Sequence, residues 1–392
     1  MNLDKAVVFV STIFLTFFGL LLNASVITTQ RKYFFKEVLL VSLGIVVFVL
    51  VLRFFEFDIL KKRWIYIVGG IILFLLLTYL LIFGKPMNNA RRWLYIGPIS
   101  IQVSEIVKLY VISLIAYSIY KYPRDTLMQC IVYAFILVLS VLILFEPDLG
   151  MSFFIVFIST VLFVVANMYD RKKVVIVISF VAIISVLLVF FYFLPDKLAK
   201  RFRFTKMAKA RVVSMVSYQK RRVIRFTRKF FPYKIDFDFS HFSLKLLPRT
   251  YEREIAYSMQ SSKVKEAIEN ATWFGAGLSQ GSLTKYLPER QNDYISVLAL
   301  EETGILGVCI LGFLFLIMFI SILRIGLNSD SVFVQYLVTG IGFVIFVQAL
   351  LHFGVNFQVL PEKGISLPFV SYGGTSYLIN ITMIAMVLKA RV

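Results

Sequence analysis

Several charged side chains lie inside or beside long apolar runs, and their types and spacing suit them to chemistry. A charge at the centre of a membrane costs roughly 2.5–3.5 kcal/mol on insertion scales, so each such residue needs a partner, a water-filled cavity or a function. Glu105 and Lys108 are three positions apart, on one face of a helix, where their charges can neutralise each other. We interpret them as a structural or cavity-lining ion pair, with a direct catalytic role as the alternative.

A second group of acidic residues begins at Asp293, which precedes an apolar run, and continues two turns later with Glu301 and Glu302. Asp293 can be a helix N-cap and nothing more. Residues 303–323 alone, however, are long and apolar enough to span a membrane. We therefore expect the acidic turns before them to line an outward-facing cavity rather than to contact lipid.

Three more patches add polar groups at the ends of apolar runs. Asp148 lies in a tight acidic turn, where it either caps the next helix or contributes to a cation or substrate site. Arg91 and Arg92 suit an anionic ligand, because guanidinium groups match phosphate oxygens in geometry. Residues 360–376 contain two prolines and several small residues just where apolar sequence resumes. Non-helical backbone at that depth must face protein or water, so we expect a cavity wall.

The elements that position these residues are membrane helices. The chain has 392 residues, 59% of them hydrophobic and 16% charged, which is more apolar surface than a soluble core can hide. We predict an all-α polytopic integral membrane protein that forms a single domain over residues 1–392, with a first span that is not cleaved as a signal peptide. The ten predicted spans cover residues 6–28, 38–52, 64–83, 101–120, 126–144, 151–168, 174–194, 294–323, 332–348 and 367–388.

Lysine and arginine residues in the short loops favour a cytoplasmic location for both termini. The large loop at 195–292, between the seventh and eighth spans, then lies outside the cell. Its front half alternates basic and apolar residues, which favours an amphipathic helix on anionic lipid over a solvated loop. Its back half is glycine-rich, which lets backbone approach a ligand closely. The net charge of +20 sits in loops, so we expect anionic lipids or pyrophosphates as partners and no nucleic acid.

Four blocks of sequence, taken in order, resemble the SEDS proteins (shape, elongation, division and sporulation) of the RodA, FtsW and SpoVE type. Ten spans with a long outer loop after the seventh also match the layout of that family. The chain departs from the family pattern at Glu146, where Gln is usual, at Val103, where Pro is usual, and at Gln291–Asn292, where His-Thr is usual. The matching blocks are ARRW (90–93) with QVSEIVK (102–108), EPDLG (146–150), LPERQNDY (287–294) with EETG (301–304), and LPEKG (360–364) with LPF (367–369) and SYGG (371–374).

The resemblance implies a peptidoglycan glycosyltransferase in the bacterial cytoplasmic (inner) membrane. Such an enzyme polymerises lipid II on the outer face, releases undecaprenyl pyrophosphate, and works with a class B penicillin-binding protein in elongation, division or sporulation. It implies that Asp293 is the base that takes the proton of the acceptor hydroxyl, or that it positions a divalent cation, Mg²⁺ or Mn²⁺. Our candidates for substrate binding are Arg91, Arg92, Glu289, Lys363, Ser371 and Gly373, although Lys363 stands where the family usually has Thr or Ser.

Two other functions are compatible with the same blocks. A lipid II flippase would use the cavity beside Glu105, Lys108, Glu301 and Glu302 as a substrate path, but the sequence shows none of the internal repeats typical of transporters. A non-catalytic scaffold that docks a penicillin-binding protein is the third hypothesis, since the neighbours of Asp293 depart from the family pattern.

Overall fold

We describe the protein from a computed structural model, which covers residues 2–25, 27–85, 91–96, 99–146, 148–167, 233–238, 243–248, 259–283, 287, 290–360 and 364–391. The expected seventh span, nearly all of the basic front half of the large loop, Glu289 and Lys363 lie outside these residues. Asp293 and the other candidate site residues lie within them.

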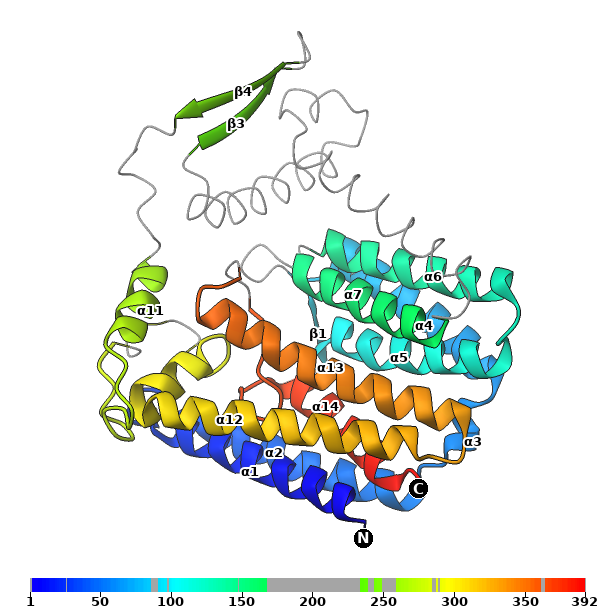
Figure 1. The fold of residues 1–392 in the computed structure, drawn as a ribbon, viewed down its shortest axis with the longest axis horizontal. Coiled ribbons are helices and arrows are strands. Elements are labelled where there is room, and N and C mark those ends of the chain that lie inside the picture. Colours follow the sequence, from blue (N-terminus) through cyan, green and yellow to red (C-terminus); the bar gives the residue numbers. More distant parts are fainter. Residues whose placement is uncertain are drawn as a thin grey trace.

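The described chain is a bundle of apolar helices (Figure 1). Seven helices are long and apolar enough to cross a membrane by length and composition, and two shorter apolar helices join them, so nine of the ten predicted spans correspond to helices. The all-α polytopic fold is therefore confirmed, and the protein is an integral membrane protein. The nine helices are α1 (Leu3–Ser25), α2 (Ile27–Phe54), α4 (Arg63–Phe83), α5 (Val103–Lys121), α6 (Thr126–Phe145), α7 (Leu149–Ala166), α12 (Ile295–Leu327), α13 (Val332–Asn356) and α14 (Gly374–Lys389).

Short elements connect the helices. Helix α3 (Phe57–Leu60) lies between α2 and α4, and α11 (Met259–Glu269) lies in the large loop. Two antiparallel strand pairs were not predicted from the sequence: β1 (Trp93–Ile96) with β2 (Ile99–Gln102), and β3 (Tyr233–Asp238) with β4 (Ser243–Pro248). Figure 1 shows both chain termini at the end of the bundle away from α11.

Several predicted boundaries differ from the structure. The largest difference is at α2, which begins at Ile27 rather than at 38. Helix α5 begins at Val103 rather than at 101, because the preceding residues pair as strand β2. Helix α13 continues past Gln348 to Asn356, because the polar residues of its last turns have partners inside the protein. Helix α14 begins at Gly374 rather than at 367, because the residues before it form turns that hydrogen bond to the chain beside Asp293.

Burial separates central helices from lipid-facing ones. Helix α5, which carries Glu105 and Lys108, has 78% of its apolar window buried inside the protein, whereas α2 has 11%. The core runs between α1, α5, α12, α13 and α14, with completely buried side chains such as Leu15, Leu337 and Ile384. An apolar surface left exposed on the outer helices is what a lipid solvent requires. Glu105 and Lys108 therefore lie in the middle of the bundle.

Candidate functional site

Asp293 is held at the start of α12 by contacts to the backbone around it. Tyr372 N donates to Gln291 O (3.0 Å), Ser371 Oγ donates to Asn292 O (2.8 Å), and Asn356 Nδ2 donates to Asp293 O (2.8 Å). Three successive carbonyl groups are thus fixed by α13 and by the segment before α14. The N-cap of α12 is Tyr294, so the alternative reading of Asp293 as a capping residue is wrong.

The carboxylate of Asp293 lies against the backbone of Gly364. A Cβ atom placed on Gly364 would come within 2.6 Å of Asp293 Oδ2 and 2.9 Å of Oδ1, so only glycine permits this approach. The predicted cavity wall formed by residues 360–376 therefore includes at least one backbone stretch that faces a carboxylate directly. Ser371 and Gly373, both predicted site residues, belong to the same segment, where Gly373 N donates to Ser371 O (2.8 Å).

Two residues of α13 that the sequence reasoning missed support this arrangement. His352 is completely buried, and its Nδ1 lies 2.6 Å from Ile365 O, so Nδ1 donates and Nε2 is left as an acceptor. Asn356 Nδ2 lies 3.2 Å from that Nε2 and also donates to Asp293 O. His352 and Asn356 are one helical turn apart in an apolar sequence, and such a pair of polar residues could have indicated buried hydrogen-bond partners. The predicted span ended at Gln348 and left both outside it.

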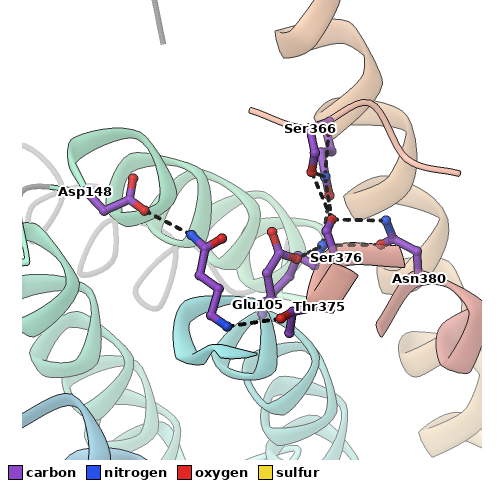
Figure 2. Close-up of polar contacts among 9 residues, drawn as sticks. Glu105, Asp148, Ser366, Thr375, Ser376 and Asn380 are labelled. Atoms are coloured by element: carbon purple, nitrogen blue, oxygen red, sulfur yellow. Dashed lines mark hydrogen bonds and ion pairs between the residues drawn. The ribbon is translucent and has the colours of Figure 1, made fainter. Parts of the chain in front are cut away.

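Glu105 and Lys108 form a buried ion pair inside the bundle, with 2.7 Å between Lys108 Nζ and Glu105 Oε2. The same ammonium group donates to Gln348 Oε1 (2.8 Å) and to Asn380 Oδ1 (3.3 Å), so uncharged acceptors share its charge with Glu105. Gln348 Nε2 in turn donates to Ser366 O (2.9 Å). Figure 2 shows how this network joins α5, α13 and α14 to the segment before α14. The pair therefore fixes the helices that carry the wall of the Asp293 site.

Asp148 has several partners at once. Its Oδ1 accepts from Met151 N (3.2 Å) as the N-cap of α7, and its Oδ2 accepts from Gln102 Nε2 (3.3 Å). Arg92 Nε lies 3.7 Å from the same Oδ2. Gln102 N also donates to Thr375 Oγ1 (3.1 Å), as Figure 2 shows, so the acidic turn is connected to α14. Asp148 therefore caps α7 and also lies beside Arg92, while its contribution to a cation or substrate site stays a prediction.

The two arginines point to different partners. Arg91 Nη1 donates to Ile82 O (2.9 Å), one of the last carbonyl groups of α4, whereas Arg92 Nε donates to Glu146 O (3.4 Å) beside Asp148. The guanidinium of Arg92 is partly exposed, with 23% of its side chain accessible. The Arg92 side chain therefore lies beside an acidic residue and is also partly accessible to solvent.

Glu146 lies outside the spanning helices, at the end of α6, and only 1% of it is exposed. Burial, with a smaller contribution from the charge of Asp148, raises the pKa of its carboxyl group to about 9, against an opposing effect of Arg92. Glu146 is therefore an uncharged carboxylic acid at neutral pH. It has the charge of the glutamine that is usual at this position in the SEDS pattern, which explains how the departure is accommodated.

Glu301 and Glu302 accept hydrogen bonds from the large loop and from the end of α1. Glu301 Oε1 accepts from Ser282 N (2.5 Å) and Leu283 N (2.7 Å) of the large loop, and Glu302 Oε1 accepts from Ser25 Oγ (2.8 Å) at the end of α1. Arg290 is buried nearby, and burial lowers the pKa of its guanidinium group while the charges of both glutamates oppose that change. The sequence reasoning assigned no role to Arg290, three residues before Asp293.

The structure thus places Ser371 beside Asp293, with Gly373 in the same segment. Ion pairs and hydrogen bonds join Glu105 and Lys108 to Ser366, and Arg92 and Asp148 to Thr375, both near that segment. Glu37 of α2, which was not singled out, shares a small cavity with Ser371 and Gly373, and its Oε1 accepts from Asn23 Nδ2 (2.8 Å). Among the described residues, no three His, Cys, Asp or Glu side chains come together in a way that could hold a metal. A divalent cation positioned by Asp293 therefore stays a prediction, and the chemistry below uses none.

Two known proteins match most of this chain in sequence. The chain is 27% identical over 403 residues to a protein of Coxiella burnetii, covering 97% of this chain and 94% of that protein. It is 27% identical over 367 residues to one of Hydrogenovibrio crunogenus, covering 91% and 81%. Both relatives carry the name "Probable peptidoglycan glycosyltransferase FtsW".

Two solved structures share the fold. A chain of a peptidoglycan synthase complex superposes with a TM-score of 0.72 at 18% identity, covering 97% of this chain and 95% of that one. The rod shape determining protein RodA of Thermus thermophilus superposes with a TM-score of 0.64 at 16% identity, covering 97% and 94%. The sequence model of the FtsW, RodA and SpoVE cell cycle proteins matches residues 5–392. The chain therefore belongs to the FtsW/RodA/SpoVE family of cell cycle proteins, the SEDS family.

Proposed function

We propose that this protein is a peptidoglycan glycosyltransferase that polymerises lipid II into glycan strands on the outer face of the cytoplasmic membrane. The observation that carries the proposal is the Asp293 carboxylate, which lies against the backbone of Gly364 while three neighbouring carbonyl groups are fixed. The names of the FtsW relatives support the same reaction. A carboxylate fixed in this way is suited to act as a general base.

In the proposed reaction, a carboxylate oxygen of Asp293 takes the proton of the acceptor sugar hydroxyl. The hydroxyl oxygen then forms a bond to the anomeric carbon of the donor sugar, and the bond from that carbon to the pyrophosphate oxygen breaks. The electron pair leaves with undecaprenyl pyrophosphate. Cationic groups stabilise the negative charge that develops there.

The candidates for that second role are Arg91, Arg92 and Lys363, to which we add Arg290. Arg92 keeps part of its guanidinium exposed beside Asp148, and Arg290 precedes Asp293 by three residues. Guanidinium groups match pyrophosphate oxygens in geometry. Glu289, Ser371 and Gly373 complete the proposed substrate-binding set, in which Ser371 also holds the backbone beside Asp293.

The same proposal places the protein in its cell. With both termini in the cytoplasm, Asp293 and its neighbours face outward, where lipid II presents its sugar. A class B penicillin-binding protein is the proposed partner, because a new glycan strand must be crosslinked as it is made. One of the matching folds comes from a peptidoglycan synthase complex, which is in keeping with such an assembly.

The test is glycan polymerisation from labelled lipid II by the purified protein, with and without its class B penicillin-binding protein. Asp293→Asn is compared with Asp330→Asn, which removes an exposed carboxylate from the turn between α12 and α13. We expect long glycan from the wild type and from Asp330→Asn, and none from Asp293→Asn. Equal polymer from all three proteins would contradict the role of Asp293. No polymer from any of them, in a folded complex, would favour a scaffold or a flippase.

A further inference from the structure

Helix α12 is interrupted at Gly304, where φ is 73° and ψ is −170°. In a continuous helix, the N–H groups of residues 305 and 306 would donate to the carbonyl groups of residues 301 and 302. Here residues 272–277 of the large loop take the place of the missing helical partners, so both N–H groups and both carbonyl groups are hydrogen bonded. The four backbone hydrogen bonds are Ile305 N to Thr272 O (3.0 Å), Leu306 N to Trp273 O (3.1 Å), Ala276 N to Glu301 O (2.8 Å) and Gly277 N to Glu302 O (3.0 Å).

The joint between residues 272–277 and α12 is tight. Gly275 and Gly304 both have φ of 73°, a conformation that L side chains rarely adopt. A Cβ on Gly275 would come within 2.5 Å of Glu302 O, and one on Gly304 would collide with Gly275 N. Loop and helix therefore move as one body, unless these hydrogen bonds break.

The loop presents large apolar side chains to its surroundings. Trp273 is 68% exposed, Phe274 is 78% exposed and Leu278 is 46% exposed. Isolated apolar residues on a surface need no explanation, but three within six positions form a patch. We call these three side chains the aromatic patch.

The aromatic patch continues a lipid-facing stripe of α12. Leu306, Ile310 and Phe313 are 46%, 47% and 60% exposed and lie one helical turn apart, as expected for a face that contacts acyl chains. Leu306 is the residue whose N–H group bonds to Trp273, so the patch lies at the end of this stripe. The same loop reaches the end of α1, where Ser279 Oγ donates to Ser25 O (3.1 Å). Figure 1 shows the loop beside α11 at the end of the bundle where α12 begins.

We propose that the aromatic patch inserts into the boundary between lipid head groups and acyl chains. Tryptophan favours that boundary because its ring is apolar and its N–H group is polar. Through the joint at Gly304, the patch holds the first turns of α12, and with them Asp293, at a fixed depth relative to the membrane surface. The occupant of the patch is lipid, and its continuity with the stripe on α12 is what distinguishes lipid from a soluble partner. The inference does not depend on the reaction that Asp293 carries out.

The test uses tryptophan fluorescence of the full chain in lipid vesicles. The sequence contains three tryptophans, so Trp64→Phe with Trp93→Phe leaves Trp273 as the single emitter. We expect emission at shorter wavelength than for tryptophan in water. We also expect the strongest loss of intensity with lipids brominated near the head group, less with lipids brominated deep in the chain, and little with aqueous iodide. Should the double variant fail to fold, the difference between wild type and Trp273→Phe gives the same quantities.

A matched variant calibrates the depth. Phe313→Trp, in a chain with the three native tryptophans changed to Phe, places the emitter on the lipid-facing stripe of α12 and is expected to be quenched best by the deep bromine atoms. If Trp273 is instead quenched freely by iodide and not by brominated lipid, the patch is in water and the proposal is overturned. Quenching by lipid only when the penicillin-binding protein is absent would show that a protein covers the patch, and would overturn it as well.

Hydrogen exchange measures separately whether the aromatic patch stabilises the joint with α12. Trp273→Ser with Phe274→Ser removes the patch, and we expect faster amide hydrogen exchange at Ile305 and Leu306 in vesicles, because the joint loses its anchor. Unchanged exchange at these two amides would show that lipid contact and the position of α12 are independent.

Discussion

Replacing Glu146 with glutamine tests the electrostatic account of the site at a residue that departs from the family pattern. Burial raises the pKa of the Glu146 carboxyl group from 4.5 to about 9, so the folded protein holds a proton that the unfolded chain releases. Stability rises with pH only where the unfolded state binds more protons, and here the folded state binds more. The wild type therefore loses stability as pH increases from about 4.5 to about 9.

The magnitude follows from the same shift. Each pH unit within the window lowers the free energy of unfolding by at most about 1.4 kcal/mol. At pH 7, about 2.5 units above the usual pKa, the carboxyl group thus costs up to about 3.5 kcal/mol, which Glu146→Gln removes because the amide does not ionise. We expect the variant to match the wild type near pH 4.5 and to be increasingly more stable above it.

Thermal unfolding in detergent at a series of pH values from 5 to 8 measures this difference. The pH dependence of all other groups cancels when the variant is compared with the wild type at each pH. Glu266→Gln, at a half-exposed carboxylate of α11, controls for the loss of one acidic group. A stability difference between Glu146→Gln and the wild type that stays constant from pH 5 to 8 would refute the reasoning.

Three further changes probe the framework around Asp293. Lys108→Met leaves Glu105 buried without its ion partner and should lower the free energy of unfolding by about 3–5 kcal/mol. Exchanging the two residues should recover part of that stability, and no recovery would contradict a simple ion pair. Gly304→Ala strains a residue with φ of 73° and should lower the melting temperature, whereas Gly312→Ala, with open space around its Cβ position, should not. His352→Ala should displace the backbone at Asp293 and lower kcat while KM changes little, because a misplacement of about 1 Å can lower the rate on the order of 10²-fold. A rise in KM alone would argue against a role of His352 in positioning Asp293.

The spans were predictable because long apolar runs have few alternatives in a membrane protein. Where the prediction failed, polar residues inside helices lowered the hydropathy of a run without ending it. Helix α13 continues through His352 and Asn356 because Ile365 O and Asp293 O satisfy them, and neither partner can be identified from local sequence. Tertiary hydrogen bonds therefore decide where such a helix ends.

The residue types of the site were easier to predict than the contacts between them. Spacing alone placed Glu105 beside Lys108, because three positions on a helix fix that distance. The approach of Asp293 to Gly364 joins residues about 70 positions apart, and only the family pattern suggested that they belong together. The break at Gly304 was also not foreseen, because a glycine inside a helix costs only about 1 kcal/mol and normally leaves it intact. The hydrogen bonds missing from the helix are replaced by bonds to residues 272–277, which lie about 30 positions earlier in the chain.

The most direct test of the central claim separates substrate binding from turnover at Asp293. Binding of fluorescent lipid II and glycan formation are both measured for the wild type and for Asp293→Asn. If Asp293 is the general base, binding stays close to that of the wild type, while turnover falls by on the order of 10²-fold or more. Loss of binding in parallel with turnover, or turnover that persists in the variant, would contradict the account.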